Sequence, residues 1–426
     1  MKRRTFFHAS AGSAALLAGT ASAAPAATGA STVKIAGRTL PELREEHRFW
    51  LFDDFLPFMD KYVIDHELGG FMCTADRDGT QISSDKRGWY EGRGIWVYSF
   101  LYNKLAKEQK YIDVADKSVK FIMKYKPSGD NIWPETYKKD GTNNGKGDTR
   151  LYGDMFIALG LQEYSKATGD VQYWNLAKEN ILKDVRLYDR PDYEKTGVRV
   201  SGVWMCLINT ISGALENKRD GDLEKVLDRS IDAIFNYHYN PEFQLDNEEL
   251  NHDMSRNPKT ARSAFLGHPI ETFWMIMYDA IRRKDKKNFT LAAERFRRHA
   301  EVAWDNVYGG VFEGLDNVDT NTFSLPLRKV LWEQGEVLVG SLCVYEHTGA
   351  PWALEMYERM YTYVLDKFPL KKYGFHLWME WGDRKMTFQP HASRVEHFHH
   401  PRHLMLNMLA LDRMIKRGGR PSGIFG

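Results

Sequence analysis

One pattern recurs along this chain: an apolar helix, a short polar break and a second, amphipathic helix. It occurs at five places, which are residues 99–122, 157–181, 210–234, 272–296 and 337–361. Corresponding points lie roughly 55–65 residues apart, and several of the breaks carry the Gly and Asp that end one helix and cap the next. The repeat predicts a fold assembled from helical hairpins rather than from separate domains.

The two ends of this repeated region complete the helix count. Residues 41–64 and 400–417 each have the pattern of an apolar helix that lacks a partner in its own hairpin. An open solenoid, the alternative, would present a polar cap at each end. We therefore expect these two helices to pair. Five hairpins and this closing pair give about twelve helices, which predicts an all-α, single-domain (α/α)6 barrel over residues 31–426.

Residues 1–30 have the pattern of a signal peptide and short leader. A basic start precedes an apolar stretch at 9–18, and small residues at 21–23 form a cleavage site. Arg3 and Arg4, followed by Thr-Phe-Phe, favour the twin-arginine type, with a Sec signal as the alternative. We expect a periplasmic or secreted protein without a membrane anchor after cleavage, because no later segment has about 18 consecutive apolar residues.

Composition and motifs exclude several classes of partner. The 59 basic and 57 acidic side chains leave a formal net charge of +2, which argues against a nucleic-acid partner. Three distant cysteines predict neither a disulfide framework nor a thiolate zinc site. No phosphate-binding glycine motif opens a helix, so we expect no cofactor. The histidine run at 397–403 contains Pro401 and no HExxH motif, so we expect no metal either.

The expected connections are short inside each hairpin and long between hairpins. The long ones cover about residues 65–92, 128–151, 185–201, 239–264, 304–328 and 368–398. Long loops in a compact domain are usually functional. In a ring of alternating inner and outer helices these loops all emerge at one rim, so we expect the residues at the following helix starts to line a common pocket.

Residues of catalytic and aromatic type recur at these helix starts. The candidates are Tyr90, Arg93, His268, Glu271, Trp274, Trp332, Glu336, His399 and Arg402. Aromatic faces stack on the apolar patches of a sugar, and charged groups bind its hydroxyls, so this set is typical of a sugar pocket. Each residue also has a structural interpretation as a helix cap, a core aromatic or an ion pair.

Several of these segments resemble the N-acylglucosamine 2-epimerase superfamily. The similar stretches are EGRGIWVYSFLYNKL from Glu91, YGDMFIALGLQEYSKATGD from Tyr152, GHPIETFW from Gly267, WEQGEVLVG from Trp332 and FHHPR from Phe398. The superfamily includes cellobiose 2-epimerases and aldose–ketose isomerases and uses (α/α)6 barrels. The resemblance extends over about residues 89–403, which is most of the chain.

The resemblance implies roles for the candidates. His268 and His399 match the acid/base pair that would move the C2 proton of a reducing sugar through an ene-diolate, and imidazole suits both roles near neutral pH. Arg93 matches the anchoring arginine. The residues expected to support or bind the sugar are Tyr90, Glu271, Trp274, Trp332, Glu336 and Arg402. The expected partner is a small sugar, and a homodimer is left open.

Alternatives stay open at this point. The third inner helix has Met205–Asn209 where cellobiose epimerases carry a histidine pair, which favours a monosaccharide or N-acyl sugar. An aldose–ketose isomerase would use the same intermediate. A glycoside hydrolase or lyase would need a carboxylate pair, for which Glu91, Asp154, Glu271 and Glu336 are candidates. A non-catalytic glycan-binding protein would use only the aromatic rim.

Overall fold

The computed structural model describes residues 33–193, 197–318, 328–369, 373 and 394–425. The expected signal peptide lies outside these residues. Within them, no helix combines the length and the apolar character that a membrane crossing requires.

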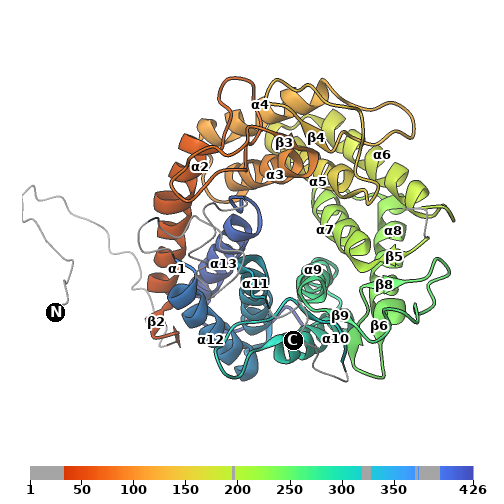
Figure 1. The fold of residues 1–426 in the computed structure, drawn as a ribbon. Helices are drawn as coiled ribbons and strands as arrows, with labels where there is room; N and C mark the ends of the chain where they lie inside the picture. The colour runs from red at the N-terminus through yellow and green to blue at the C-terminus, as the bar shows by residue number, and fades with distance from the viewer. Residues whose placement is uncertain (1–32, 194–196, 319–327, 370–372, 374–393, 426) are drawn as a thin grey trace, which may run out of the picture. The chain divides into compact units, whose positions relative to one another are not determined.

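Six helices within the described residues form an inner ring (Figure 1). They are α3 (Gly88–Lys104), α5 (Tyr152–Thr168), α7 (Ser201–Asn217), α9 (Gly267–Arg283), α11 (Leu331–Thr348) and α13 (His399–Lys416). Each packs against the next, and α13 returns to α3. Most of their residues are buried, as expected of helices that are apolar on nearly all sides.

The outer helices are amphipathic and cover this ring. They are α1 (Leu40–Arg48) continued by the π-helical η1 (Phe49–Phe55) and by α2 (Leu56–Tyr62), then α4 (Gln109–Met123), α6 (Val171–Tyr188), α8 (Gly221–Asp232) continued by η2 (Ala233–His238), α10 (Lys286–Ala303) and α12 (Pro351–Lys367). Asp170, Asp220 and Asp285 cap α6, α8 and α10 by accepting hydrogen bonds from first-turn amides. The short breaks therefore end and start helices as predicted.

The ring closes through the two ends of the domain. Helix α1 packs against α13, and Arg44 Nε lies 3.1 Å from Asp412 Oδ1 across their contact. Both helices bury an apolar side in this way, which an open solenoid would leave exposed. The predicted (α/α)6 barrel is confirmed, and the helix expected at 41–64 covers residues 40–62 and contains the η1 segment.

One close contact shows why inner helices need glycine. A Cβ atom on Gly92 of α3 would lie 2.2 Å from the backbone carbon of Phe156 on α5. A Cβ atom on Gly160 of α5 would lie 2.6 Å from the Gly92 carbonyl oxygen. Both distances are shorter than any real contact, so α3 and α5 approach this closely only because two glycines meet.

Two-residue strands tie the long connections together. The antiparallel pairs are β1 (Lys34–Ile35) with β2 (Arg38–Thr39), β3 (Lys86–Arg87) with β4 (Thr136–Tyr137), β5 (Arg199–Val200) with β8 (Glu249–Leu250), β6 (Tyr239–Asn240) with β7 (Leu245–Asp246), and β9 (Ala264–Phe265) with β10 (Gly314–Leu315). Three of these pairs each join two successive long connections. These pairs link the connection at 65–92 with that at 128–151, and they link the connections at 185–201, 239–264 and 304–328 with one another.

The same loop structure stabilises this rim at two places. Asp65 and Asp305 each begin a D-x-x-x-G-G segment after an outer helix. Lys86 Nζ lies 2.8 Å from Asp65 Oδ2, and Lys329 Nζ lies 2.6 Å from Asp305 Oδ2. Each lysine also donates to the carbonyl of the first glycine in its loop. Because both ion pairs are nearly fully buried and further hydrogen-bonded, they hold the two loops in the same shape.

Candidate active site

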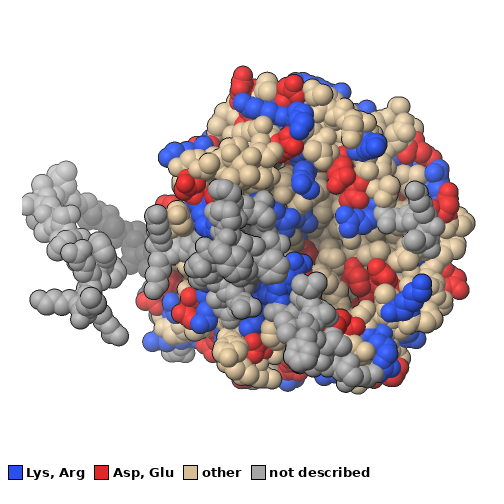
Figure 2. All heavy atoms as spheres, in the orientation of Figure 1, with Lys and Arg blue, Asp and Glu red and all other residues tan. Residues whose placement is uncertain are grey.

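A cavity of about 310 Å³ opens at the N-terminal ends of the inner helices. In the space-filling view, the hollow near the centre of the ring is bordered by both basic and acidic side chains (Figure 2). Five of the candidate residues line it, and these are Arg93, His268, Glu271, Trp332 and His399. The rim expected from the asymmetric loops therefore does surround a pocket.

His399, the first residue of α13, is held by a buried carboxylate. Its Nδ1 atom lies 2.9 Å from Glu336 Oε1 and 3.0 Å from Arg402 Nη2. Arg402 Nη2 already donates to Glu271 Oε1 and to Glu336 Oε1, which uses both of its protons. His399 Nδ1–H must therefore be the donor to Glu336, and this tautomer leaves the lone pair on Nε2.

Burial keeps the His399 ring neutral. It lowers the pKa of His399 to about 3, because the nearby carboxylates of Glu271 and Glu396 only partly offset the loss of solvation. The ring centroid of His399 lies 5.2 Å from that of Trp332, so the indole fixes one side of the imidazole. A neutral ring with a free Nε2 is a proton acceptor at neutral pH.

His268 faces the same cavity, but its pKa is shifted in the opposite direction. Its Nδ1 atom lies 3.0 Å from Glu248 Oε1, and Ser201 Oγ donates to the other oxygen of that carboxylate. Burial alone would lower the pKa of His268, but the charge and hydrogen bond of Glu248 outweigh it and raise the pKa. His268 thus keeps its proton to a higher pH than a free imidazole does, and in that form its Nε2–H is a proton donor.

Trp332 connects the two histidines. Its ring centroid lies 6.1 Å from that of His268 and 5.2 Å from that of His399. Phe265 stacks on the indole as well, at 6.4 Å between centroids. The Trp332 indole therefore lies beside both the proton acceptor His399 and the proton donor His268 in the same cavity.

Arg93 carries the cationic charge on the α3 side of the cavity. Its guanidinium lies 4.7, 4.0 and 4.8 Å from the ring centroids of Trp89, Phe156 and Phe398. Aromatic rings offer no strong hydrogen-bond acceptor, and Arg93 Nε has no hydrogen-bond partner among the described residues. Burial in this setting lowers the pKa of Arg93 to about 10, so the group remains charged.

The other four candidates, which are Tyr90, Trp274, Glu336 and Arg402, do not line this cavity. Trp274 Nε1 donates to Glu336 Oε2 over 2.6 Å, and Arg402 bridges carboxylates behind His399. Tyr90 is buried, and its carbonyl accepts a hydrogen bond from His397 Nε2. Two of these four side chains, those of Trp274 and Arg402, hold the Glu336 carboxylate that binds His399.

Sequence reasoning missed two carboxylates that matter here. Glu248 lies in the long connection before α9, and its acidic neighbours there were the available signal. Glu396 Oε1 accepts hydrogen bonds from the amides of Phe398 and His399, both over 2.8 Å, and so caps α13. Burial would raise the pKa of Glu396, but His399 and Arg394 outweigh it and lower the pKa to about 2.

The carboxylates of Glu271 and Glu336 and the ring of His399 lie close enough to resemble a metal site, with ligand atoms within 4.8 Å of one another. The Arg402 guanidinium contacts all three of them. A cation of the protein's own thus takes the coordinating atoms, and the cluster does not fit a resident metal ion.

Two of the carboxylates considered for a hydrolase are engaged in the scaffold. Glu91 is fully buried and accepts hydrogen bonds from the Phe71 amide and from Ser118 Oγ. Asp154 is buried beside Lys183, which forms an ion pair with it. Neither lines the cavity, so they cannot act as an acid and nucleophile on a sugar there.

A family model supports the assignment made from motifs. The model described as "N-acylglucosamine 2-epimerase (GlcNAc 2-epimerase)" matches residues 69–401. The chain is 24% identical to the N-acylglucosamine 2-epimerase of Rattus norvegicus over 340 residues, 76% of this chain and 80% of that protein. It is 27% identical to the cellobiose 2-epimerase of Dictyoglomus turgidum over 358 residues, 77% of this chain and 89% of that protein.

Solved structures of low sequence identity share the fold. The cellobiose 2-epimerase from Spirochaeta thermophila superposes with a TM-score of 0.73 at 16% identity, covering 88% of this chain and 98% of that one. A D-mannose isomerase superposes with a TM-score of 0.70 at 13% identity, covering 88% and 97%. Two histidines face one cavity, and the family model matches most of the chain. Because of that match, this chain belongs to the N-acylglucosamine 2-epimerase family.

Proposed function

We propose that this protein inverts C2 of a reducing monosaccharide or N-acyl sugar by moving a proton between the two faces of an ene-diolate. The observation that carries the proposal is the pair His268 and His399. Each is held at Nδ1 by a carboxylate, both face one cavity, and the pKa is raised for His268 but lowered for His399. A pair of groups with separated pKa values is the usual arrangement for an acid and a base.

The chemistry follows from these states. In the open-chain sugar, neutral His399 Nε2 removes the C2 proton. The electron pair of the broken C–H bond forms the C1–C2 double bond, and the C1 carbonyl oxygen becomes an oxyanion. Protonated His268 then delivers its proton to the opposite face of C2, and the C1 carbonyl re-forms. In the reverse reaction the two histidines exchange roles.

Arg93 is the group that stabilises the oxyanion. Its side chain lies at the cavity among aromatic rings, and its Nε–H has no acceptor among the described residues. As negative charge develops on the C1 oxygen during the reaction, that oxygen becomes an acceptor for the Arg93 donor. A positioned charged donor of this kind lowers the barrier more than it strengthens ground-state binding.

The cavity wall on α7 favours the smaller substrates. Met205 and Cys206 line it there, so this side of the pocket is apolar and polarisable. An apolar wall suits the methyl group of an N-acyl substituent better than the hydroxyls of a second sugar ring. The name of the rat relative, N-acylglucosamine 2-epimerase, agrees with this choice.

Proton exchange in deuterated water tests the proposal. The protein is incubated with N-acetylglucosamine, N-acetylmannosamine, glucose and mannose, and products are followed by NMR. Deuterium at C2 together with the C2 epimer is the expected result. A ketose would instead indicate protonation at C1 and the aldose–ketose isomerase, which the shared fold of the D-mannose isomerase keeps as second candidate. Glycosidic cleavage of oligosaccharides without exchange would refute both.

We also propose that the reaction takes place outside the cytoplasm. This rests on the basic, apolar and small-residue order of residues 1–30. Expression of the full chain in a bacterium, followed by fractionation and N-terminal sequencing, should give a periplasmic protein cleaved near residue 23. The homodimer left open by the sequence is checked on the same sample by light scattering.

A further inference from the structure

A second cavity, of about 240 Å³, lies at the other end of the inner helices. Lys104 is the last residue of α3, Glu216 lies next to the end of α7, and Arg413 lies in the last turn of α13. The first cavity is lined instead by first-turn residues such as His268 and His399. These two cavities therefore lie at opposite ends of the barrel axis.

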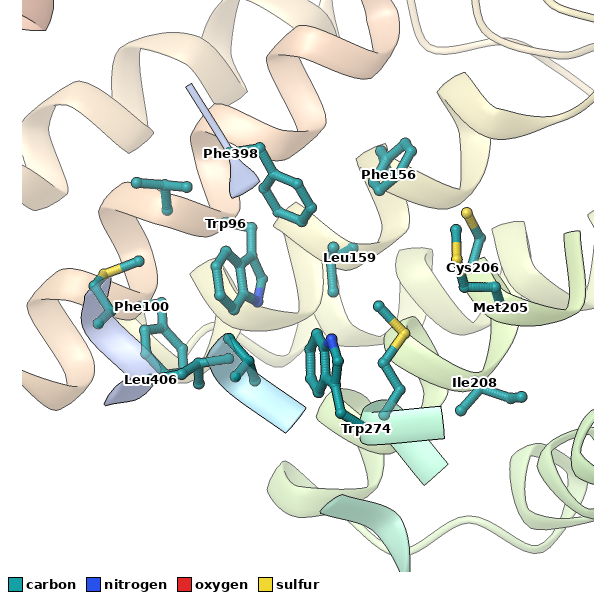
Figure 3. Packing of buried hydrophobic residues seen from close by; sticks show 14 of the residues in the cluster. Trp96, Phe100, Phe156, Leu159, Met205, Cys206, Ile208, Trp274, Phe398 and Leu406 are labelled. Carbon is teal, nitrogen blue, oxygen red and sulfur yellow. The ribbon is translucent and has the colours of Figure 1, made fainter. Parts of the chain in front are cut away.

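Aromatic rings form much of the wall of this second cavity. Trp96 and Phe100 of α3 and Trp274 and Tyr278 of α9 line it. Figure 3 shows Trp96, Phe100 and Trp274 projecting into the interior of the ring. Flat aromatic faces bind the apolar faces of sugar rings and other polyols, which carry C–H groups on one side and hydroxyls at the edge.

Two residues of this wall carry donors without a hydrogen-bond partner in the described part of the chain. Arg402 lines the cavity and is only 1% exposed, and among the described residues its Nε and Nη1 atoms have no hydrogen-bond partner. Ser212 also lines the cavity, and its buried Oγ has no partner there either. Buried donors are normally satisfied, so these atoms indicate a ligand that supplies oxygen acceptors.

The charges around this cavity are already paired. Lys104 lies 3.8 Å from Glu216, and Arg413 lies 2.7 Å from Glu346. Glu163, also in the wall, pairs with Lys166 at 3.0 Å. Arg402 itself contacts two carboxylates. An anion would gain no free positive charge here, so hydroxyl or carbonyl oxygens of an uncharged molecule fit best.

Two residues in the wall of the second cavity also contact Glu336, the carboxylate that holds His399. Arg402 Nη2 donates to Glu336 Oε1, and Trp274 Nε1 donates to Glu336 Oε2. Glu336 in turn accepts from His399 Nδ1. A molecule that binds Arg402 and stacks on Trp274 therefore touches the partners of the carboxylate that orients His399.

We propose that the second cavity is a binding site for a neutral polyhydroxylated molecule of monosaccharide size or smaller. We also propose that occupancy of this site alters the hydrogen bond between Glu336 and His399. The aromatic walls stack on the apolar face of the ligand, and Arg402 and Ser212 donate to its oxygens. Binding is independent of the proposed epimerase reaction, whereas an effect on catalysis rests on that reaction.

Calorimetric titration of the whole protein tests the binding. The probes are glucose, N-acetylglucosamine, glycerol and inorganic phosphate. Leu409, which lines only the second cavity, is changed to Trp to fill it, with Leu409→Met as the matched control and Ser212→Phe as a second filling variant from another helix. Arg93→Met weakens the first site. We expect one neutral probe to bind in a way that the Arg93→Met protein retains. The affinity of this binding should fall at least tenfold in both filling variants.

Three results would overturn the binding proposal. They are the absence of such an event with every neutral probe, equal binding by the folded filling variants and the control, and binding of phosphate alone. Circular dichroism checks that each variant is folded.

The link to His399 has its own readout. The imidazole signals are recorded by NMR and the His399 signal is assigned with His399→Asn. Addition of the bound probe to the Arg93→Met protein should shift this signal, and the shift should vanish in the double variant with Leu409→Trp. An unmoved signal refutes the coupling. If the probe shifts the His399 signal but the unsubstituted protein shows no C2 exchange, the proposed reaction is refuted while the proposal of a second binding site remains supported.

Discussion

The imidazole Nδ1 of His399 lies 2.9 Å from Oε1 of Glu336, although 63 residues separate them in the chain. The same carboxylate accepts a hydrogen bond from Trp274 and pairs with Arg402. The contact fixes the tautomer of the histidine, so one buried carboxylate determines which nitrogen of His399 faces the cavity.

Replacement of His399 tests its place in the reaction. His399→Ala should lower C2 deuterium exchange by about 10²- to 10⁴-fold, because the proton acceptor is lost while the cavity remains. Exchange is measured by NMR in deuterated water, and circular dichroism monitors the fold. The matched control is His66→Ala, since the His66 side chain is 53% exposed and lies outside the cavity. Normal exchange by His399→Ala would remove this residue from the mechanism.

Removal of the Glu248 charge should alter the pH dependence. In the native protein the carboxylate raises the pKa of His268, so the protonated acid persists to higher pH. Glu248→Gln keeps a hydrogen-bond acceptor but removes the charge. The alkaline fall in kcat should therefore move to lower pH.

Glu249→Gln is the control for this change, because Glu249 is the next residue in the chain, carries the same charge and does not line the cavity. Profiles of kcat against pH are recorded for the three proteins. A uniform loss of activity at all pH values, without a shift of the alkaline limb, would show that Glu248 acts only in packing.

Replacement of Arg402 should destabilise the barrel. Arg402→Met leaves Glu271 and Glu336 buried without their cation, which costs about 3–5 kcal/mol in the free energy of unfolding. Denaturant titration measures this change in the free energy of unfolding. The double variant Arg402→Met with Glu336→Gln should recover part of the loss, because one buried charge is removed. Arg44→Met, at a partly exposed ion pair with Asp412, should cost at most about 1 kcal/mol.

Stability should fall in mild acid. Burial lowers the pKa of His47 and of His299 to about 4, below the ordinary value of 6.5. Their stabilisation is present above pH 6.5 and is lost as the pH falls toward 4, because the unfolded chain binds protons that the folded chain excludes. A shift of this size corresponds to about 3 kcal/mol per histidine at the acid end.

Denaturant titrations between pH 7.5 and 4.5 check this dependence. His299→Gln removes one buried imidazole with a lowered pKa and should make the dependence shallower, while His66→Gln, at an exposed position, should leave it unchanged. A free energy of unfolding that stays constant over this range would contradict the prediction.

The predictable part of the site came from local patterns. His268 and Glu271, three residues apart, share one face of α9, and both line the cavity. Trp332 and His399 stand in the first turn of their inner helices and line it too. A helix start after a long loop is visible in sequence, so residues there could be assigned to the rim before their contacts were known.

The same reasoning failed for residues further along the helices or within the loops. Trp274 and Arg402 lie about two turns and one turn into their helices, and their side chains contact Glu336 instead of lining the active-site cavity. Glu248 belongs to a loop, where no periodicity predicts which way a side chain points. Helical spacing identifies a shared face, but it does not give the depth a long side chain reaches.

The sequence by itself determined the helical hairpins, their short turns, the long loops and the types of residue at each inner-helix start, because all of these depend on neighbours within a few turns of chain. Only the tertiary structure decided that His399 pairs with Glu336 and His268 with Glu248, and that Arg402 lies between two carboxylates and a second cavity. Those contacts join segments far apart in sequence, and they exist because closure of the ring sets the distance and depth at which the inner helices meet.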